Sequence, residues 1–79
     1  MVEIHPSARK HGIRDGDILH AMKNALAIAY LDDQRRVYVG HGRNAALLEV
    51  MTSISTDGSE LAIHAMKMRR KFAHLLGGP

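Results

Sequence analysis

The spacing of the apolar residues changes at residue 27, and this change constrains the fold more than any other feature of the sequence. Before it, Ile18, Leu19, Met22, Ala25 and Leu26 recur at the spacing of one helix face. After it, the pattern has the period of two that is typical of strands. A run of helix followed by a run of strands indicates an α+β domain with an antiparallel sheet packed against helices.

Breaks in the pattern divide the chain into elements. Strands are expected at residues 2–5, 27–31, 36–40, 47–55 and 60–68. Helices are expected at residues 6–11, from residue 15 to the start of the second strand, and at 69–76, with residues 77–79 frayed. The predicted order is therefore β-α-α-β-β-β-β-α in a single domain over residues 1–79, with a largely antiparallel sheet packed on the two N-terminal helices.

Two local signals make this prediction more specific. Asp15 is expected to cap the second helix, because a carboxylate at this position accepts hydrogen bonds from free backbone amides. Asp57-Gly58 predicts a tight hairpin turn in which both central residues have positive φ.

The composition excludes several classes of site. The chain has 79 residues and no cysteine, which excludes a disulfide framework, a cysteine-based zinc site and a thiol nucleophile. Its aromatic residues are one Phe and two Tyr, too few for a platform of stacked bases. A domain this small buries only about 60% of its unfolded surface, so a shallow site is expected rather than a deep pocket.

The cations are unevenly distributed. The net charge is only +3, but residues 35–43 and 61–79 contain no acid and hold seven of the 11 cations: Arg35, Arg36, Arg43, Lys67, Arg69, Arg70 and Lys71. We expect these stretches to form one basic surface beside His64, suited to a phosphate-rich partner or an acidic protein. The alternative is a solvated cationic face.

The last strand carries the clearest candidate for chemistry. Strict alternation would place His64 on the same face as Glu60, Ala62 and Met66, a few residues before Arg69. An imidazole there is suited to proton transfer, with the arginines stabilising charge on a phosphate. It can equally be a half-buried structural residue. Tyr38 likewise is either a ring at the edge of the core or a base-stacking residue.

Metal, cofactor and membrane sites have little support in the sequence. The six histidines include no His-x-His pair and no pair four residues apart on one helix, so no metal site is expected. No glycine-rich phosphate loop or other cofactor motif is present. Neither a membrane span nor a signal peptide is recognisable, which predicts a cytoplasmic protein with no membrane partner.

Three motifs together resemble a known family. They are HPSARKHGI over residues 5–13, YVG over 38–40 with Arg43 and LLEV over 47–50, and IHAMKMRR over 63–70. In this order they are similar to the BrnT-like toxins of bacterial toxin–antitoxin modules, within the RelE/ParE superfamily. Where that family commonly has Ser-Ala-Arg in the last strand, this chain has His-Ala-Met at 64–66.

The resemblance implies a RelE-like fold, ribonuclease activity that inhibits translation, and a cognate antitoxin with a DNA-binding part, such as a ribbon-helix-helix, that covers the basic face. The RNA substrate is in some cases ribosome-associated. The expected catalytic residues are His64, Arg69, Arg70 and Arg43, and the expected RNA-binding residues are Lys10, His11, Arg36, Tyr38, Lys67 and Lys71. The alternatives are a non-catalytic module that binds nucleic acid or a protein partner, and a gyrase-directed toxin of the ParE type.

Overall fold

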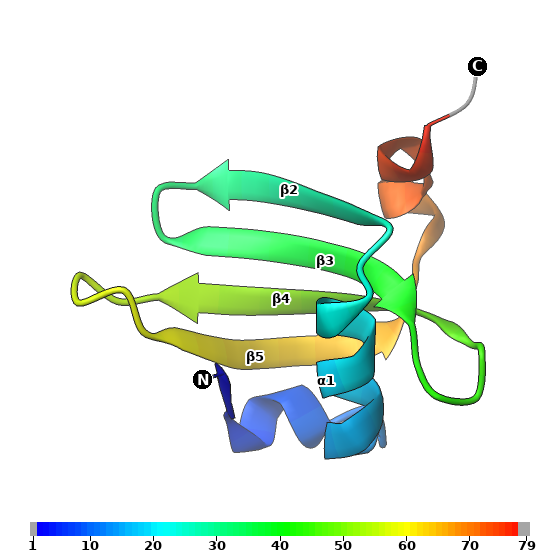
Figure 1. Cartoon of the computed structure of the whole chain (residues 1–79), viewed down its shortest axis with the longest axis horizontal. Coiled ribbons are helices and arrows are strands. Elements are labelled where there is room, and N and C mark those ends of the chain that lie inside the picture. Colours follow the sequence, from blue (N-terminus) through cyan, green and yellow to red (C-terminus); the bar gives the residue numbers. More distant parts are fainter. Residues whose placement is uncertain (1, 78–79) are drawn as a thin grey trace.

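Five strands form one sheet in the order β1-β5-β4-β3-β2 in the computed structural model, which describes residues 2–77 (Figure 1). The strands are β1 (Val2–Ile4), β2 (Ala27–Asp32), β3 (Arg35–His41), β4 (Leu47–Ile54) and β5 (Glu60–Lys67). All neighbouring strands are antiparallel except β1, which runs parallel to β5. The predicted α+β class and the four-strand meander are confirmed.

Helical segments cover both faces of this sheet. The helix α1 (Asp15–Lys23) packs on one face, which faces the viewer in Figure 1, where Ile18 contacts a core that includes Tyr38. The 3₁₀ helix η2 (Arg70–Leu76) packs on the other face, where Phe72 contacts Val37 and Val39. Tyr38 lies between these two valines in β3, so the alternation of the strand separates the two cores. Among the described residues, no helix is long and apolar enough to cross a membrane.

The first and last helical segments are 3₁₀ rather than α-helical. The expected helix at residues 6–11 is the 3₁₀ helix η1 (Pro6–Arg9), and Gly12 ends the segment with φ +77°. A single turn gains too few hydrogen bonds to offset the cost of nucleating an α-helix. Gly77 ends η2 with φ 77°, whereas residues 78–79 of the expected frayed end lie outside the described residues.

The expected capping role of Asp15 is wrong. The N-cap of α1 is Arg14, which makes no side-chain capping bond, and Asp15 lies in the first turn. Its carboxylate accepts two hydrogen bonds from the Arg9 guanidinium, both of 2.8 Å. The acid still complements the positive end of the helix dipole, but it also ties α1 to the preceding turn.

The apolar face of α1 is narrower than the sequence pattern predicts. Ile18 and Ala21 are fully buried, whereas Leu19 is 42% exposed and Leu26 is 58% exposed. The helix ends at Lys23, so Leu26 lies outside it and does not continue its buried stripe.

A bulge in β5 changes which side chains share a face. Met51 is paired with His64 and Thr52 with Ala62, which leaves Ile63 as the extra residue. Ala62 and Ala65 therefore both lie in the core beneath α1, and Glu60 bonds to Tyr38 on the same side. The prediction that Glu60 and Ala62 share a face with His64 is wrong. His64 and Met66 remain together on the η2 side, because the strand alternates normally beyond the bulge.

The turn between β4 and β5 is also longer than predicted. In this turn Gly58 has a positive φ of 87°, but Asp57 does not. The prediction that both central residues have positive φ is therefore wrong for Asp57. The Asp57 carboxylate instead accepts a hydrogen bond of 2.9 Å from the Ser59 amide. A loop over residues 55–59 with one left-handed glycine replaces the two-residue turn.

Gly40 sets the distance between α1 and the sheet, which gives a first prediction. A Cβ at this position would collide with the backbone carbonyl oxygen of Ala21. We expect Gly40→Ala to lower the free energy of unfolding by about 2–3 kcal/mol, because backbone atoms cannot move aside as a flexible side chain can. Urea denaturation measures the change. His41→Ala, at the exposed next position, is the control and should change stability by less than about 0.5 kcal/mol; equal effects of the two substitutions would contradict the packing argument.

Candidate active site

A buried carboxylate lies at the centre of the candidate site. Glu49, in the middle of β4, points to the η2 side of the sheet and its side chain is 0% exposed. One of its oxygens, Oε2, lies 3.0 Å from Nε2 of His64 and 2.6 Å from Nη2 of Arg69. The other, Oε1, accepts a hydrogen bond of 2.8 Å from the backbone amide of Arg69.

The path of the chain after β5 explains this arrangement. The amide of Met68 donates to the carbonyl of Leu47 over 3.0 Å, which continues the pairing beyond the end of β5. The next residue, Arg69, is thereby carried over Glu49. A buried carboxylate is stable only if its charge is compensated by hydrogen-bonded partners, and here a cation, an amide and an imidazole supply them.

The pKa of Glu49 reflects a balance of opposing effects. Burial raises the pKa of this carboxyl, but the hydrogen bonds from the side chain and amide of Arg69 and from His64 outweigh burial and hold the pKa below its ordinary value. Glu49 is therefore ionised at neutral pH. An ionised carboxylate accepts hydrogen bonds only, so Nε2 of His64 is the protonated ring nitrogen and Nδ1 is the one free to accept a proton.

A second imidazole lies next to the first. The rings of His11 and His64 are 5.6 Å apart, centre to centre, at an angle of 78°. His11 is held there because η1 is anchored to β5: the Ser7 hydroxyl donates to the carbonyl of Ile63 over 2.7 Å. Two ionisable rings therefore meet at the surface above Glu49, one fixed by a carboxylate and the other exposed.

Three further predicted residues flank this cluster. Lys10 precedes His11, and Arg70 and Lys71 follow Arg69; all three are exposed. The cations of Arg69 and Lys71 lie over the ring of Phe72, at 5.7 and 5.1 Å from its centre, which orders the start of η2. We call Lys10, Arg70 and Lys71 the cationic rim: they are exposed cations next in sequence to His11 or close after Arg69.

Arg36 and Tyr38 lie on the opposite face of the sheet, beneath α1 rather than beside His64. Tyr38 is only 6% exposed, and its hydroxyl donates to Glu60 over 2.6 Å. Burial, and then the contact with Glu60, raise the pKa of Tyr38. A buried phenol cannot offer its ring to a base, so the structural alternative for Tyr38 is the one that the geometry favours.

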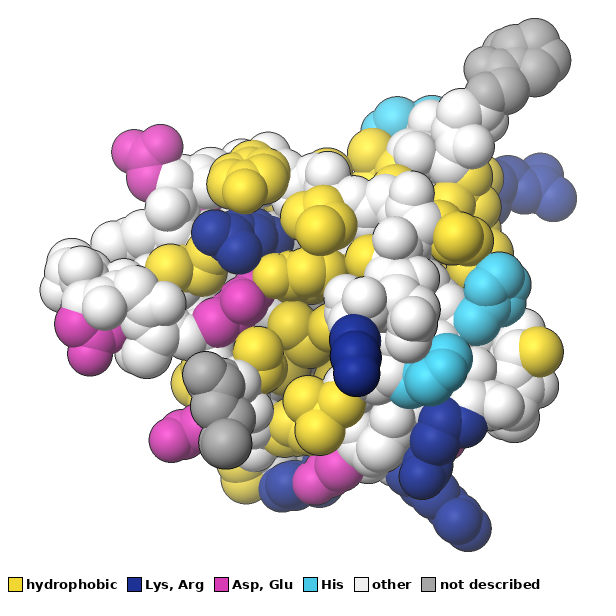
Figure 2. Space-filling view, viewed as in Figure 1, with side chains coloured by type: hydrophobic (Ala, Val, Ile, Leu, Met, Phe, Trp, Pro, Cys, Tyr) yellow, Lys and Arg dark blue, Asp and Glu magenta, His cyan; other side chains and the backbone are white. Residues whose placement is uncertain are grey.

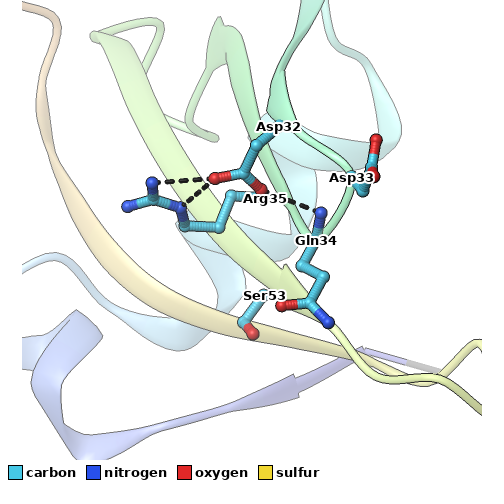
Figure 3. Close-up of a pocket in the computed structure, with 5 residues that line it drawn as sticks. All are labelled: Asp32, Asp33, Gln34, Arg35 and Ser53. Carbon is cyan, nitrogen blue, oxygen red and sulfur yellow. Dashed lines mark hydrogen bonds and ion pairs between the residues drawn. The ribbon is translucent and has the colours of Figure 1, made fainter.

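The other predicted cations are also held away from the histidines. Arg43 pairs with Asp17 of α1 at 3.0 Å, and Lys67 lies in register with Leu48 on the α1 side. Arg35 pairs with Asp32 at 2.8 Å, within the shallow hollow at the β2–β3 turn shown in Figure 3. The two basic stretches therefore do not form one surface: Arg35 is paired locally with Asp32, and Arg36 and Arg43 are paired with Glu60 and Asp17 from other elements, away from His64.

Glu49 is not among the site residues predicted from the sequence. Its signal was present: a single acid inside the apolar run of residues 47–51. A charged residue at a strand position that faces a core requires a partner, but the sequence does not say which cation comes close enough. Within residues 2–77, no group of three or more His, Cys, Asp or Glu side chains is arranged to hold a metal ion.

Comparison of the chain with protein-family models, with curated proteins and with solved structures finds no significant match. The function is therefore argued from the site itself.

The role of Glu49 as the buried anchor of His64 and Arg69 gives a second prediction. Glu49→Gln keeps the size of the side chain but leaves Arg69 without its counter-charge, so we expect a loss of about 2–3 kcal/mol at pH 7. Since the folded pKa of Glu49 is depressed, its stabilising effect is complete above the ordinary carboxyl range and is lost as the pH falls through that range toward the folded pKa.

Urea denaturation of both proteins at pH 7 and at pH 3.5 measures this effect. The difference between wild type and Glu49→Gln should shrink at the lower pH, because the Glu49 carboxyl of the unfolded wild-type chain takes up a proton more readily than that of the folded chain. A difference that is the same at both values would show that the charge of Glu49 is not what stabilises the site.

Proposed function

We propose that this protein is a metal-independent endoribonuclease. The observation that carries the proposal is the pair of adjacent imidazoles, His11 and His64, of which His64 is fixed by the buried Glu49 carboxylate. Cleavage of RNA through its own 2′-hydroxyl requires one group that removes a proton and another that supplies one, together with a cation on the phosphate. The cluster contains all three.

His64 is suited to the role of general base. Its Nε2 is held by Glu49, so Nδ1 can take the proton of the 2′-hydroxyl as that oxygen attacks the adjacent phosphorus. The new oxygen–phosphorus bond forms as the bond to the 5′-oxygen breaks. The carboxylate keeps the ring in one orientation and stabilises the imidazolium that results, as it does in other carboxylate–histidine pairs.

His11 is suited to the role of general acid. It lies beside His64 and is exposed, so its protonated form can deliver a proton to the departing 5′-oxygen. The products are a 2′,3′-cyclic phosphate and a free 5′-hydroxyl. No atom in this balance has to come from a metal-bound water.

Arg69 is suited to stabilising the phosphate. Its Nε and Nη2 are both bonded to Glu49, which fixes the plane of the guanidinium, and Nη1 makes none of these bonds. A guanidinium fixed in this way can donate to a phosphate oxygen without losing its own orientation. The exposed Lys10, Arg70 and Lys71 would contact the phosphates on either side.

The resemblance to BrnT-like toxins extends this proposal to a biological role. In that role the chain is the toxin of a type II toxin–antitoxin module in the cytoplasm, its RNA cleavage inhibits translation, and a DNA-binding antitoxin neutralises it by covering the cationic rim. The RelE-like arrangement of the sheet belongs to the same proposal.

A non-catalytic binding module is the second candidate. It is favoured by the four hydrogen bonds from Arg69 to Glu49, which by themselves fasten η2 to the sheet and give the cluster a structural purpose. Both candidates bind RNA in a salt-dependent manner, so only cleavage separates them.

Cleavage of RNA in the presence of a chelator is the third prediction. Purified protein with EDTA should yield fragments ending in a 2′,3′-cyclic phosphate, with a bell-shaped dependence of rate on pH, because one histidine must be neutral and the other protonated. His64→Ala and His11→Ala should each lower the rate by at least about 100-fold.

The matched control is His20→Ala, which removes an imidazole from α1 on the other side of the sheet and should leave the rate unchanged. Mass spectrometry of the fragment ends gives the product chemistry. RNA that is bound but left intact by the folded wild-type protein would favour the binding module instead.

Growth arrest on overexpression is the fourth prediction. Expression in a bacterial host should stop growth and protein synthesis, and His64→Ala or His11→Ala should relieve the arrest although both variants accumulate as folded protein, because each leaves the Glu49–Arg69 pair in place. Toxicity that neither substitution reduces would contradict the site. Loss of DNA supercoiling with intact RNA would point to a gyrase-directed toxin.

A further inference from the structure

The outer edge of β2 has features of a surface that another strand covers. β2 is the last strand of the sheet, and no strand lies beyond it in the part of the chain that the structure describes (Figure 1). Alternate residues of an edge strand direct their backbone N–H and C=O groups outward, where they are free to pair with another strand.

From Ala27 to Tyr30, β2 lacks the usual devices that keep such an edge from pairing; an irregularity at Leu31 and the charge of Asp32 follow only at its end. Charged side chains, prolines, bulges or a very short length normally protect an exposed edge. The opposite edge, β1, has only three residues. By contrast, β2 has six residues, no charge or proline from Ala27 to Leu31, and an irregular register only at its end, between Tyr30 and Asp32.

Large apolar side chains are exposed along the same edge. On the α1 side, Leu26, Ile28 and Tyr30 are 58%, 50% and 69% exposed, and on the η2 side Leu31 is 43% exposed. Figure 2 shows hydrophobic side chains over β2 and β3 beside α1, with a basic side chain among them. The Arg36 guanidinium lies 4.9 Å from the centre of the Tyr30 ring. Nothing in the proposed catalytic cycle uses these residues, which lie across the sheet from Glu49 or at its far edge.

We infer that this edge pairs with the β2 strand of a second copy of the chain, forming a homodimer with a continuous ten-stranded sheet. The inference goes beyond the proposed function and does not depend on RNA cleavage. Antiparallel pairing about a two-fold axis is the symmetric way to join two identical edges.

One register of the two strands places the apolar side chains of both copies opposite one another. With Ala29 opposite Ala29 of the second copy, Ile28 of each chain lies opposite Tyr30 of the other on the α1 side, and Ala27 lies opposite Leu31 on the η2 side. A β-branched residue opposite an aromatic one is a favourable cross-strand pair. The charge of Asp32 falls at the end of the paired segment, where it remains in water.

The exposed apolar side chains supply the surface that a dimer would bury. A specific interface requires about 1,000 Å² of buried surface, so pairing has to cover the exposed parts of Leu26, Ile28, Tyr30 and Leu31 in both copies together with the free backbone of both strands. Left in water, an edge with exposed apolar side chains is prone to pair with another strand.

The oligomeric state of the full chain tests this inference as a fifth prediction. Light scattering during size-exclusion chromatography should give about twice the chain mass of 8.7 kDa for the wild type at a concentration of about 100 µM, at which a dimer with a Kd of about 10 µM or less is mostly assembled. Tyr30→Lys should reduce the mass to that of one chain, because it places two charges within the apolar pair. Leu19→Lys, at an exposed apolar residue of α1 away from the edge, is the matched control and should leave the dimer intact.

A cross-link tests the register and does not depend on the Tyr30 variant folding. The chain has no cysteine, and opposed residues of antiparallel strands have Cα atoms at a distance that a disulfide can span. Mild oxidation should therefore join two chains of Ala29→Cys but not of Thr56→Cys, in the exposed β4–β5 loop. A wild type that stays monomeric, a dimer that survives Tyr30→Lys, or an Ala29→Cys variant that does not cross-link would overturn the inference; a stable monomer would leave the edge to a strand of a different protein.

Discussion

The buried carboxylate of Glu49 is the interaction on which the η2 side of this fold depends. It joins β4 to β5 through His64 and to the start of η2 through Arg69. An unpaired charge in this position would cost several kcal/mol, so the last segment of the chain cannot leave the sheet without a large penalty. One requirement of electrostatics therefore fixes the path of the C-terminal segment and orients a histidine at the surface.

The two faces of the sheet consequently have different tasks. Beneath α1, small residues such as Gly40 and Ala21 allow helix and sheet to approach closely, and Tyr38 is joined to Glu60 by a hydrogen bond of 2.6 Å. The η2 side instead combines a small apolar core around Phe72 with the ionised cluster. Both faces thus contribute to stability, but the groups suited to phosphate chemistry lie on the η2 side alone.

Much of this architecture could be predicted from the spacing of residues. The change from a helical period to a period of two marks the α+β class, and each strand of the meander begins or ends within about two residues of its expected position because turn residues such as Gly42 and Gly58 separate the apolar runs. The exceptions have local physical causes. One extra residue in β5 moves Ala62 to the other face, and a salt bridge to Arg9 takes Asp15 away from capping.

The sequence by itself determined the fold class, the order of elements and the candidacy of His64 and Arg69, because periodicity and residue chemistry are local properties. Only the tertiary structure decided which charges meet. It paired Arg36 and Arg43 with carboxylates far along the chain, and it brought His11 and Glu49 to His64 from positions 53 and 15 residues away. Electrostatic partners are chosen by distance in space, and strand register, a bulge and the path after β5 set those distances.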